Sequence, residues 1–74
     1  TMATANANPT LALLGKTVHL TEAVHGFEFE RSGTVIGVVV ALPGTQCADS
    51  ILLDRHDGAC EFYDLHDVTI RAVL

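Results

Sequence analysis

Residues 33–42 read GTVIGVVVAL and carry the strongest β-strand signal in this chain of 74 residues. β-Branched residues dominate the stretch, and they favour the extended conformation. In a regular strand, the even-numbered residues face one side, and Val35, Gly37, Val39 and Ala41 face the other. Both faces are then apolar, although an antiparallel strand with one face in water normally alternates with polar residues. The stretch therefore predicts a strand that is covered on both sides.

The segments around this strand also follow a period of two. Residues 16–20 (KTVHL) place Val18 and Leu20 on one face. Residues 21–32 are expected to form a long, strand-like loop in which Phe27 and Phe29 alternate with glutamates. Downstream, a turn-rich connection (PGTQCAD, 43–49) precedes a strand at 50–55, and VTIRAV at 68–73 forms the last strand. The pattern predicts a mainly β chain of five short antiparallel strands.

A hairpin is predicted where Asp57 and Gly58 separate two alternating runs, residues 50–55 and 60–63. A two-residue turn would place Asp54 opposite Glu61. The core face of this hairpin would then consist of Ile51, Leu53, Cys60 and Phe62, and the outward face of Leu52, Asp54, Glu61 and Tyr63.

The N-terminal region predicts a short helix. Asn8 suits the cap, Pro9 the first helical position and Gly15 the left-handed stop. So short a helix needs to pack on the sheet to persist. We expect a disordered tail at 1–8 and a single small β-barrel domain at 9–74.

Composition limits the possible partners. The formal net charge is −5, and the four basic residues (Lys16, Arg31, Arg55 and Arg71) are scattered, so nucleic-acid binding is not favoured. No apolar run is long enough to cross a bilayer, and no signal peptide is recognisable. We therefore expect a cytoplasmic protein with no membrane contact, in which Cys47 and Cys60 are free thiols.

The polar residues offer one candidate site. Asp54 opposite Glu61 would be unfavourable across a ladder, so the pair is a possible cation or polar site; alternatively, both side chains extend into water. His56 and Asp57 resemble a base and its orienting group, but no nucleophile has a defined place beside them. The spacing of the four histidines matches no metal-ligand motif. We expect no catalytic residue, no metal site and no cofactor.

The segments SGTVIGVV (32–39) and EFYDLHDVTI (61–70) resemble the small SH3-like β-barrels. The resemblance covers roughly residues 16–74 and implies a barrel with a long first loop and a short turn before the last strand. NPTLALLG followed by KTVHL is also similar to the helix-then-strand order of Sm/Hfq-like proteins, which form RNA-binding rings.

The segment CEFY at 60–63 resembles, in its spacing, the pore-lining segment of the plasmid-borne type II dihydrofolate reductases. Tyr63 matches the family's tyrosine, whereas Glu61 stands where that family has glutamine. This resemblance implies an oligomeric pore enzyme in which Glu61 and Tyr63 line a symmetric channel.

A strand that is apolar on both faces is more than so short a chain can cover, and large exposed apolar patches usually mark interaction sites. We therefore expect a homo-oligomer or a module that docks a different protein. The expected interface residues are Val35, Val39, Leu52, Tyr63 and Phe27. The alternatives are an Sm/Hfq-like RNA-binding ring and a type II dihydrofolate reductase-like pore enzyme.

Overall fold

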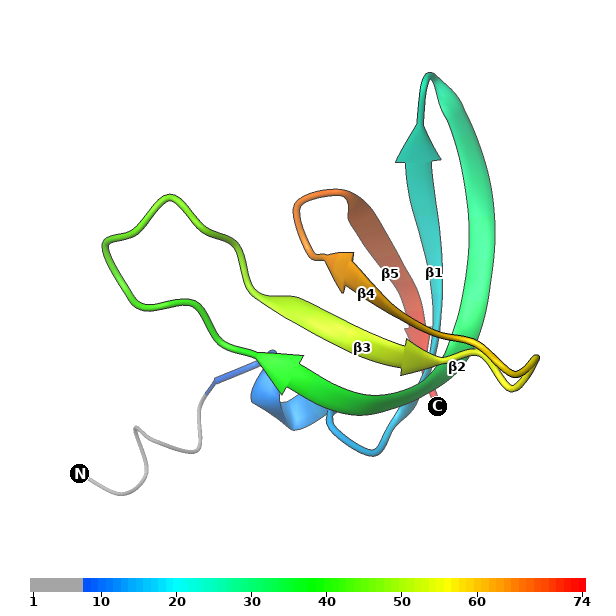
Figure 1. Ribbon diagram of the computed structural model, residues 1–74, viewed down its shortest axis with the longest axis horizontal. Coiled ribbons are helices and arrows are strands. Elements are labelled where there is room, and N and C mark those ends of the chain that lie inside the picture. Colours follow the sequence, from blue (N-terminus) through cyan, green and yellow to red (C-terminus); the bar gives the residue numbers. More distant parts are fainter. Residues whose placement is uncertain (1–7) are drawn as a thin grey trace.

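The computed structural model describes residues 8–74, which form one five-stranded antiparallel sheet (Figure 1). A 3₁₀ helix, η1 (Leu11–Leu13), precedes strands β1 (Thr17–Val24), β2 (Phe27–Val39), β3 (Ser50–Asp54), β4 (Cys60–Asp64) and β5 (Val68–Val73). The strand order is β4-β3-β2-β1-β5. The mainly β prediction with five antiparallel strands is confirmed. Of the expected tail, residues 1–7 lie outside the described residues.

The expected N-terminal helix is replaced by the single short turn η1, so that prediction is wrong in type and length. The turn η1 is bounded by Thr10 and Leu14 instead of Asn8 and Gly15, although these two flanking residues keep the local roles that the sequence predicts. Asn8 Oδ1 accepts hydrogen bonds from the backbone N–H groups of Thr10 (2.9 Å) and Leu11 (3.1 Å), and Gly15 has a φ of +83°. The helix cannot continue because the Gly15 N–H already donates to the Val35 carbonyl at 2.8 Å. No helix in residues 8–74 has the length and apolar character needed to cross a membrane.

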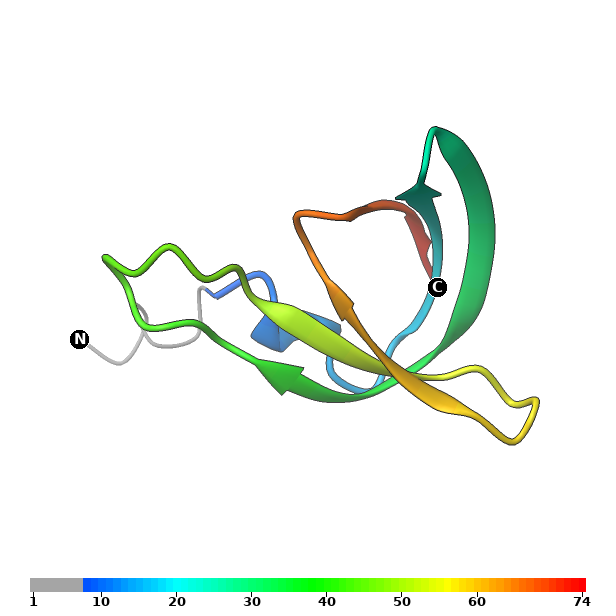
Figure 2. The same ribbon diagram turned by 45° about the horizontal axis from the view of Figure 1, so that its top comes forward.

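Strand β2 holds the sheet together because it pairs with β1 along one part of its length and with β3 along the other. It curves strongly between the two parts, and its first part forms a long hairpin with β1 that projects from the molecule (Figures 1 and 2). Gly33 lies at the bend. A Cβ atom at this position would meet the backbone of Asp54 and would lie 3.1 Å from Arg55 Cα, so only glycine allows this close approach of β2 to the end of β3.

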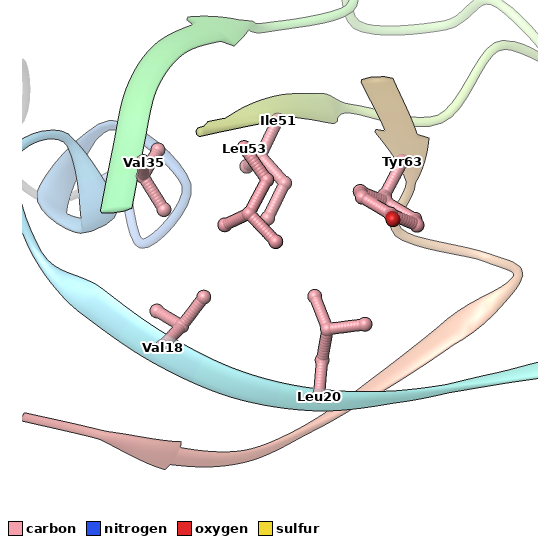
Figure 3. Packing of buried hydrophobic residues seen from close by; sticks show 6 residues of the cluster. All are labelled: Val18, Leu20, Val35, Ile51, Leu53 and Tyr63. Carbon is pink, nitrogen blue, oxygen red and sulfur yellow. The ribbon is translucent and has the colours of Figure 1, made fainter. Parts of the chain in front are cut away.

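A small core fills the concave side of the curved sheet. Its six buried residues point toward one another from four strands: Val18, Leu20, Val35, Ile51, Leu53 and Tyr63 (Figure 3). Leu13 of η1, Val38, Leu65 and Val68 pack against them and are partly buried. The Cα radius of gyration is 12.8 Å, compared with about 11 Å expected for a compact chain of this length. The β1–β2 hairpin and the β2–β3 connection both project from the core and contribute to this difference (Figure 1).

The predicted pairing of β3 with β4 is off by one residue. Asp54 pairs with Cys60, Leu53 with Glu61 and Leu52 with Phe62, so Asp54 and Glu61 are not opposite each other. The cause is a loop of three residues, His56, Asp57 and Gly58, closed by a hydrogen bond from Arg55 N–H to the Ala59 carbonyl (3.2 Å). A shift of one residue exchanges the faces of a strand.

As a result, Tyr63 enters the core, where it is 3% exposed, and Phe62 is 59% exposed. Cys60, which was expected on the core face, is exposed as well. The core-face predictions for Cys60 and Phe62 assumed a two-residue turn, and they are wrong because the loop has three residues.

Strand β2 contains a second irregularity. Its register with β3 shifts between Val35 and Gly37, so Ile36 is the extra residue of a β-bulge. Val35 and Val38 therefore both face the core although they are an odd number of residues apart. The sequence predicts that residues 34–42 alternate regularly between the two faces, and this prediction is wrong because of the bulge. Val35 is fully buried, and the outward positions after the bulge are Gly37 and Val39, opposite Leu52 and Ser50.

Candidate interaction surface

The convex face of β2, β3 and β4 carries an apolar patch in the part of the chain that the structure describes. Gly37, Leu52 and Phe62 are direct neighbours across the three strands, and Val39 lies two residues from Gly37 on the same face. We name these four residues, Gly37, Val39, Leu52 and Phe62, the outer patch. The buried neighbours Ile51 and Leu53 fix its orientation, because adjacent residues of a strand point to opposite faces.

The side chains of the outer patch are poorly covered by their own chain. Phe62 is 59% exposed and Val39 is 51% exposed, while Leu52 is half-buried. Leu52 leans over Gly37, where a methyl group in place of the glycine hydrogen would lie 3.5 Å from the Leu52 Cβ, so the missing side chain of Gly37 leaves room for Leu52. Ile36, at the bulge beside Gly37, adds another side chain that is 48% exposed.

The expected interface residues fall in three different places. Val39 and Leu52 lie in the outer patch. Val35 and Tyr63 are buried in the chain's own core, so their assignment to an outward contact surface is wrong. Phe27 is 69% exposed near the tip of the β1–β2 hairpin, on a different part of the molecule from the outer patch.

Phe62 is absent from the interface residues that the sequence predicts. Phe62 and Tyr63 are adjacent aromatic residues, and Ile51, Leu52 and Leu53 form an unbroken apolar run. Hydrophobic alternation therefore does not decide which aromatic faces inward. The orientation of Phe62 could have been found by considering a three-residue loop with Gly58 in the left-handed region in place of a two-residue turn, since longer hairpin loops often contain such a glycine.

A polar network lies at the end of the inner face, beside the β3–β4 loop. The Tyr63 hydroxyl donates to Glu61 Oε2 at 3.1 Å, and Arg55 Nη1 lies 3.3 Å from the same oxygen and 3.4 Å from the hydroxyl. Arg55 Nη2 also approaches Asp57 Oδ2 at 3.5 Å. Glu61 thus has two donors from its own chain, and the network ties the hairpin together instead of presenting an unpartnered carboxylate.

The pKa values in this network follow from burial and hydrogen bonding. Burial of the phenol raises the pKa of Tyr63 above its usual value of 10.0, against a smaller opposing effect of Arg55. The hydrogen bond to Tyr63 and the charge of Asp57 raise the pKa of Arg55. Tyr63 is therefore a neutral hydroxyl at neutral pH, and Arg55 stays charged.

The structure does not bring Asp54 and Glu61 together, because the observed register places them on opposite faces of the hairpin. Asp54 Oδ1 accepts the backbone N–H of His56 (3.0 Å), while the carboxylate of Glu61 faces Arg55 and Tyr63. His56 Nε2 lies 3.0 Å from Thr34 Oγ1, and His56 Nδ1 lies 3.9 Å from Asp54 Oδ2, whereas Asp57, the expected orienting group, pairs with Arg55. Residues 8–74 contain no group of three or more side chains suited to hold a metal ion, and they enclose no pocket.

Three of the four basic residues of the sequence form ion pairs within the chain. Arg31 pairs with Glu22 (3.6 Å), Arg55 with Glu61 (3.3 Å), and Arg71 with Glu28 (3.5 Å). Their charge is directed at carboxylates of the same chain, and no basic surface is formed by these three residues.

The two edge strands of the sheet differ. Strand β4 pairs with β3 without any shift in register. In contrast, β5 has an irregularity in its pairing with β1, where Arg71 has no Cα partner. Bulges and charged side chains hinder the addition of another strand, so β5 is a protected edge and β4 is a regular one.

A comparison with protein-family models finds no matching family, and comparisons with curated proteins and with solved structures find no match.

Proposed function

We propose that this protein is a small SH3-like barrel that acts as an interaction module by self-association through the outer patch. The observation that carries the proposal is the exposure of Phe62 beside Val39 and Leu52 on a regular sheet face. An exposed aromatic residue within a contiguous apolar surface is typical of an interaction site. Contact with a second copy of the chain at this surface removes part of it from water.

The architecture supports the SH3-like part of the proposal. β2 is shared between two halves of the sheet, as the long central strand of a small barrel requires, and only residues 65–67 separate β4 from β5. The RNA-ring alternative has less support, since Arg31, Arg55 and Arg71 pair with carboxylates of the chain. The pore-enzyme alternative needs Tyr63 in a channel, whereas Tyr63 is a core residue.

Light scattering of the purified chain tests the proposal. We expect a mass that is a multiple of 7.9 kDa, and a shift toward single copies in Phe62→Ser, which removes the largest exposed side chain of the outer patch. Phe27→Ser is the matched control, because it makes the same change at a similarly exposed position outside the patch. A single-copy mass for the unchanged protein at high concentration would refute self-association.

The control also has an outcome that counts against the proposal. If Phe27→Ser reduces the mass and Phe62→Ser does not, the contact surface is the β1–β2 hairpin. Circular dichroism of both variants establishes that the sheet is retained, because Phe62 and Phe27 are both more than half exposed and neither belongs to the core.

A further inference from the structure

The outer edge of β4 presents a defined set of unpaired backbone groups. Residues opposite each other in an antiparallel pair alternate between hydrogen-bonded and non-hydrogen-bonded positions. Arg55 N–H donates to the Ala59 carbonyl and Leu65 N–H donates to the Asp49 carbonyl, which places odd-numbered β4 residues at the hydrogen-bonded positions toward β3. The N–H and C=O groups of Cys60 and Phe62 and the N–H of Asp64 therefore point away from β3 without a partner in the described chain, whereas the Asp64 carbonyl accepts a hydrogen bond from Asp67 N–H at 2.9 Å.

From this edge we infer that two copies of the chain join by antiparallel pairing of β4 with β4 of the second copy, about a two-fold axis that passes beside Phe62. The strand pairing rests on the proposed self-association and specifies its geometry. The two sheets become one continuous sheet, in which the row Gly37, Leu52 and Phe62 continues through Phe62 and Leu52 of the second copy. The outer patches of the two chains then form a single apolar surface along their shared edge.

Backbone geometry selects this register. With the axis at Phe62, residue 60 of one copy lies opposite residue 64 of the other. The N–H and C=O groups of Cys60 and Phe62 and the N–H of Asp64 then gain a partner, and the Asp64 carbonyl accepts a second hydrogen bond beside that from Asp67 N–H. An axis at Glu61 or Tyr63 leaves the outward groups at one end of β4 without a strand partner. The strand is only five residues long, so the loss of one end is a large part of the interface.

Charge disfavours two of the alternative registers. An axis at Glu61 places two Glu61 carboxylates directly opposite each other, and an axis at Asp64 does the same for Asp64, which is unfavourable across a ladder. With the axis at Phe62, Glu61 lies opposite Tyr63 of the second copy, and Cys60 lies opposite Asp64. Each carboxylate therefore faces an uncharged side chain, and the two Phe62 rings meet at the centre.

The other edge of the sheet does not offer this arrangement. β5 is interrupted at Arg71, whose Nε donates to Thr21 Oγ1 at 3.2 Å while its Nη2 pairs with Glu28. A strand added to β5 would meet this irregularity in its middle. β4 carries neither a bulge nor a basic residue, so the regular edge is the one that pairs.

Disulfide cross-linking tests the register. The variant Cys47→Ser/Asp64→Cys keeps Cys60 and Phe62, and an added oxidant is expected to convert most of the chain into a covalent dimer, because residues 60 and 64 are cross-strand neighbours in the proposed pairing. Within one chain the two thiols cannot bridge, since four residues of a strand separate their Cα atoms by about 13 Å.

The matched control is Cys47→Ser/Ser50→Cys. Ser50 is the partner of Asp64 on β3, on the same outer face but one strand further from the edge. Its distance from Cys60 of the second copy would be about 10 Å, too far for a disulfide, so little covalent dimer is expected. If the two sheets instead stacked face to face, Ser50→Cys would cross-link at least as well as Asp64→Cys.

A second measurement needs no substitution in β4. The amide hydrogen of Phe62 is expected to exchange slowly when the protein is associated and fast after dilution to single copies, whereas the core-facing Tyr63 amide is protected in both states. This keeps the test valid even if Asp64→Cys disturbs the turn through loss of its 2.8 Å hydrogen bond from His66 N–H.

The outcomes separate the two proposals. A single-copy mass for the unchanged protein refutes both the self-association and the strand pairing. If the mass shows several copies, any one of three results refutes the strand pairing and leaves the outer patch as the contact. These results are cross-linking of Ser50→Cys, absence of cross-linking in Asp64→Cys, and fast exchange of the Phe62 amide. Selective cross-linking of Asp64→Cys with protection of Phe62 supports it.

Discussion

Phe62 and Tyr63 are neighbours in the sequence with opposite roles in the structure. Tyr63 is 3% exposed and packs with Ile51, its direct partner on β3, while its hydroxyl reaches Glu61 and Arg55 at the end of the core. A buried hydroxyl with both a donor and an acceptor role costs little to bury, whereas a buried hydroxyl without partners is destabilising. Tyr63 is therefore both a core residue and the link between the core and the β3–β4 loop.

Replacing Tyr63 with phenylalanine should lower the free energy of unfolding by about 1 kcal/mol at neutral pH, because the ring remains and only the hydrogen bonds of the hydroxyl are lost. The loss should diminish above pH 10. The folded-state pKa of Tyr63 is raised above 10.0, so its contribution is fully present below pH 10 and is lost as the pH rises through the folded-state pKa. Urea unfolding between pH 7 and 11 measures both effects.

Tyr63 is the only tyrosine in the chain, so its ionisation is directly visible by absorbance. A titration midpoint at or below 10 in the folded protein would contradict the assigned environment. So would a difference between the unchanged protein and Tyr63→Phe that stays constant across this pH range, since the same hydroxyl causes both effects.

Sequence reasoning at the scale of single residues succeeded where local chemistry decides the outcome. Asn8 caps the N-terminal turn and Gly15 adopts the left-handed conformation, as the sequence predicts. It failed for Val35 and Tyr63, whose orientation depends on an extra residue elsewhere, Ile36 in β2 for the first and one residue of the β3–β4 loop for the second. An apolar residue beside another apolar residue carries no information about such a shift.

At the scale of elements, Asp49 links three segments of the chain. Its carboxylate accepts hydrogen bonds from Thr10 Oγ1 (2.6 Å) and from the Ala41 N–H (2.7 Å), and its carbonyl accepts from the Leu65 N–H (3.0 Å). The N-terminal turn, the end of β2 and the β4–β5 turn are thereby held together. No local pattern around Asp49 predicts this role, because the partners lie up to 39 residues away.

Asp49→Ala should therefore lower the melting temperature at neutral pH. Hydrogen bonds from Thr10 and Ala41 lower the pKa of Asp49 below 3.8, so its stabilising effect is present above pH 3.8 and is lost as the pH falls through the folded-state pKa. The melting temperatures of Asp49→Ala and of the unchanged protein should converge in strong acid, which a series of thermal scans from pH 7 to pH 2 measures.

Two variants of Thr10 serve as controls for Asp49. Thr10→Ser keeps the hydroxyl and should be milder than Thr10→Val, which removes it while preserving the shape of the buried side chain. A melting temperature for Asp49→Ala equal to that of the unchanged protein at pH 7 would show that the carboxylate does not stabilise these segments.

The number and order of the strands were predictable because they depend on local alternation and turn residues. Their bounds were not: residues 21–32, expected as a long loop, belong to β1 and β2, which meet in a tight turn at His25 and Gly26. The two register shifts, between Val35 and Gly37 and in β5 near Arg71, were not. A bulge has no reliable local signature, since it arises from the curvature needed to wrap one sheet around six core residues.

On the scale of the whole molecule, the small core favours association between copies of the chain and the high net charge opposes it. Six buried hydrophobic side chains form the centre of the fold, and the formal net charge of −5 on each chain opposes close contact between copies. Association through the outer patch would remove more apolar surface from water than one chain removes alone. The stability of the folded state then becomes linked to protein concentration.

We therefore expect the melting temperature to rise with protein concentration, and to rise further with moderate salt, which screens the repulsion between two acidic chains. In Phe62→Ser the dependence on concentration should disappear, while Phe27→Ser should retain it. Calorimetry over a hundredfold range of concentration measures the effect. A melting temperature that is independent of concentration in the unchanged protein would mean that association does not stabilise the fold.

The three-residue loop between β3 and β4 has a consequence for how this chain can vary. The length of the loop determines which side chains of β4 face the core. Adding or deleting one residue would exchange the two faces of the strand, so that Phe62 would enter the core in place of Tyr63. Adding two would preserve the arrangement. Natural length variation at residues 56–58 is therefore expected to occur in even steps, or to be accompanied by a compensating bulge in the same strand.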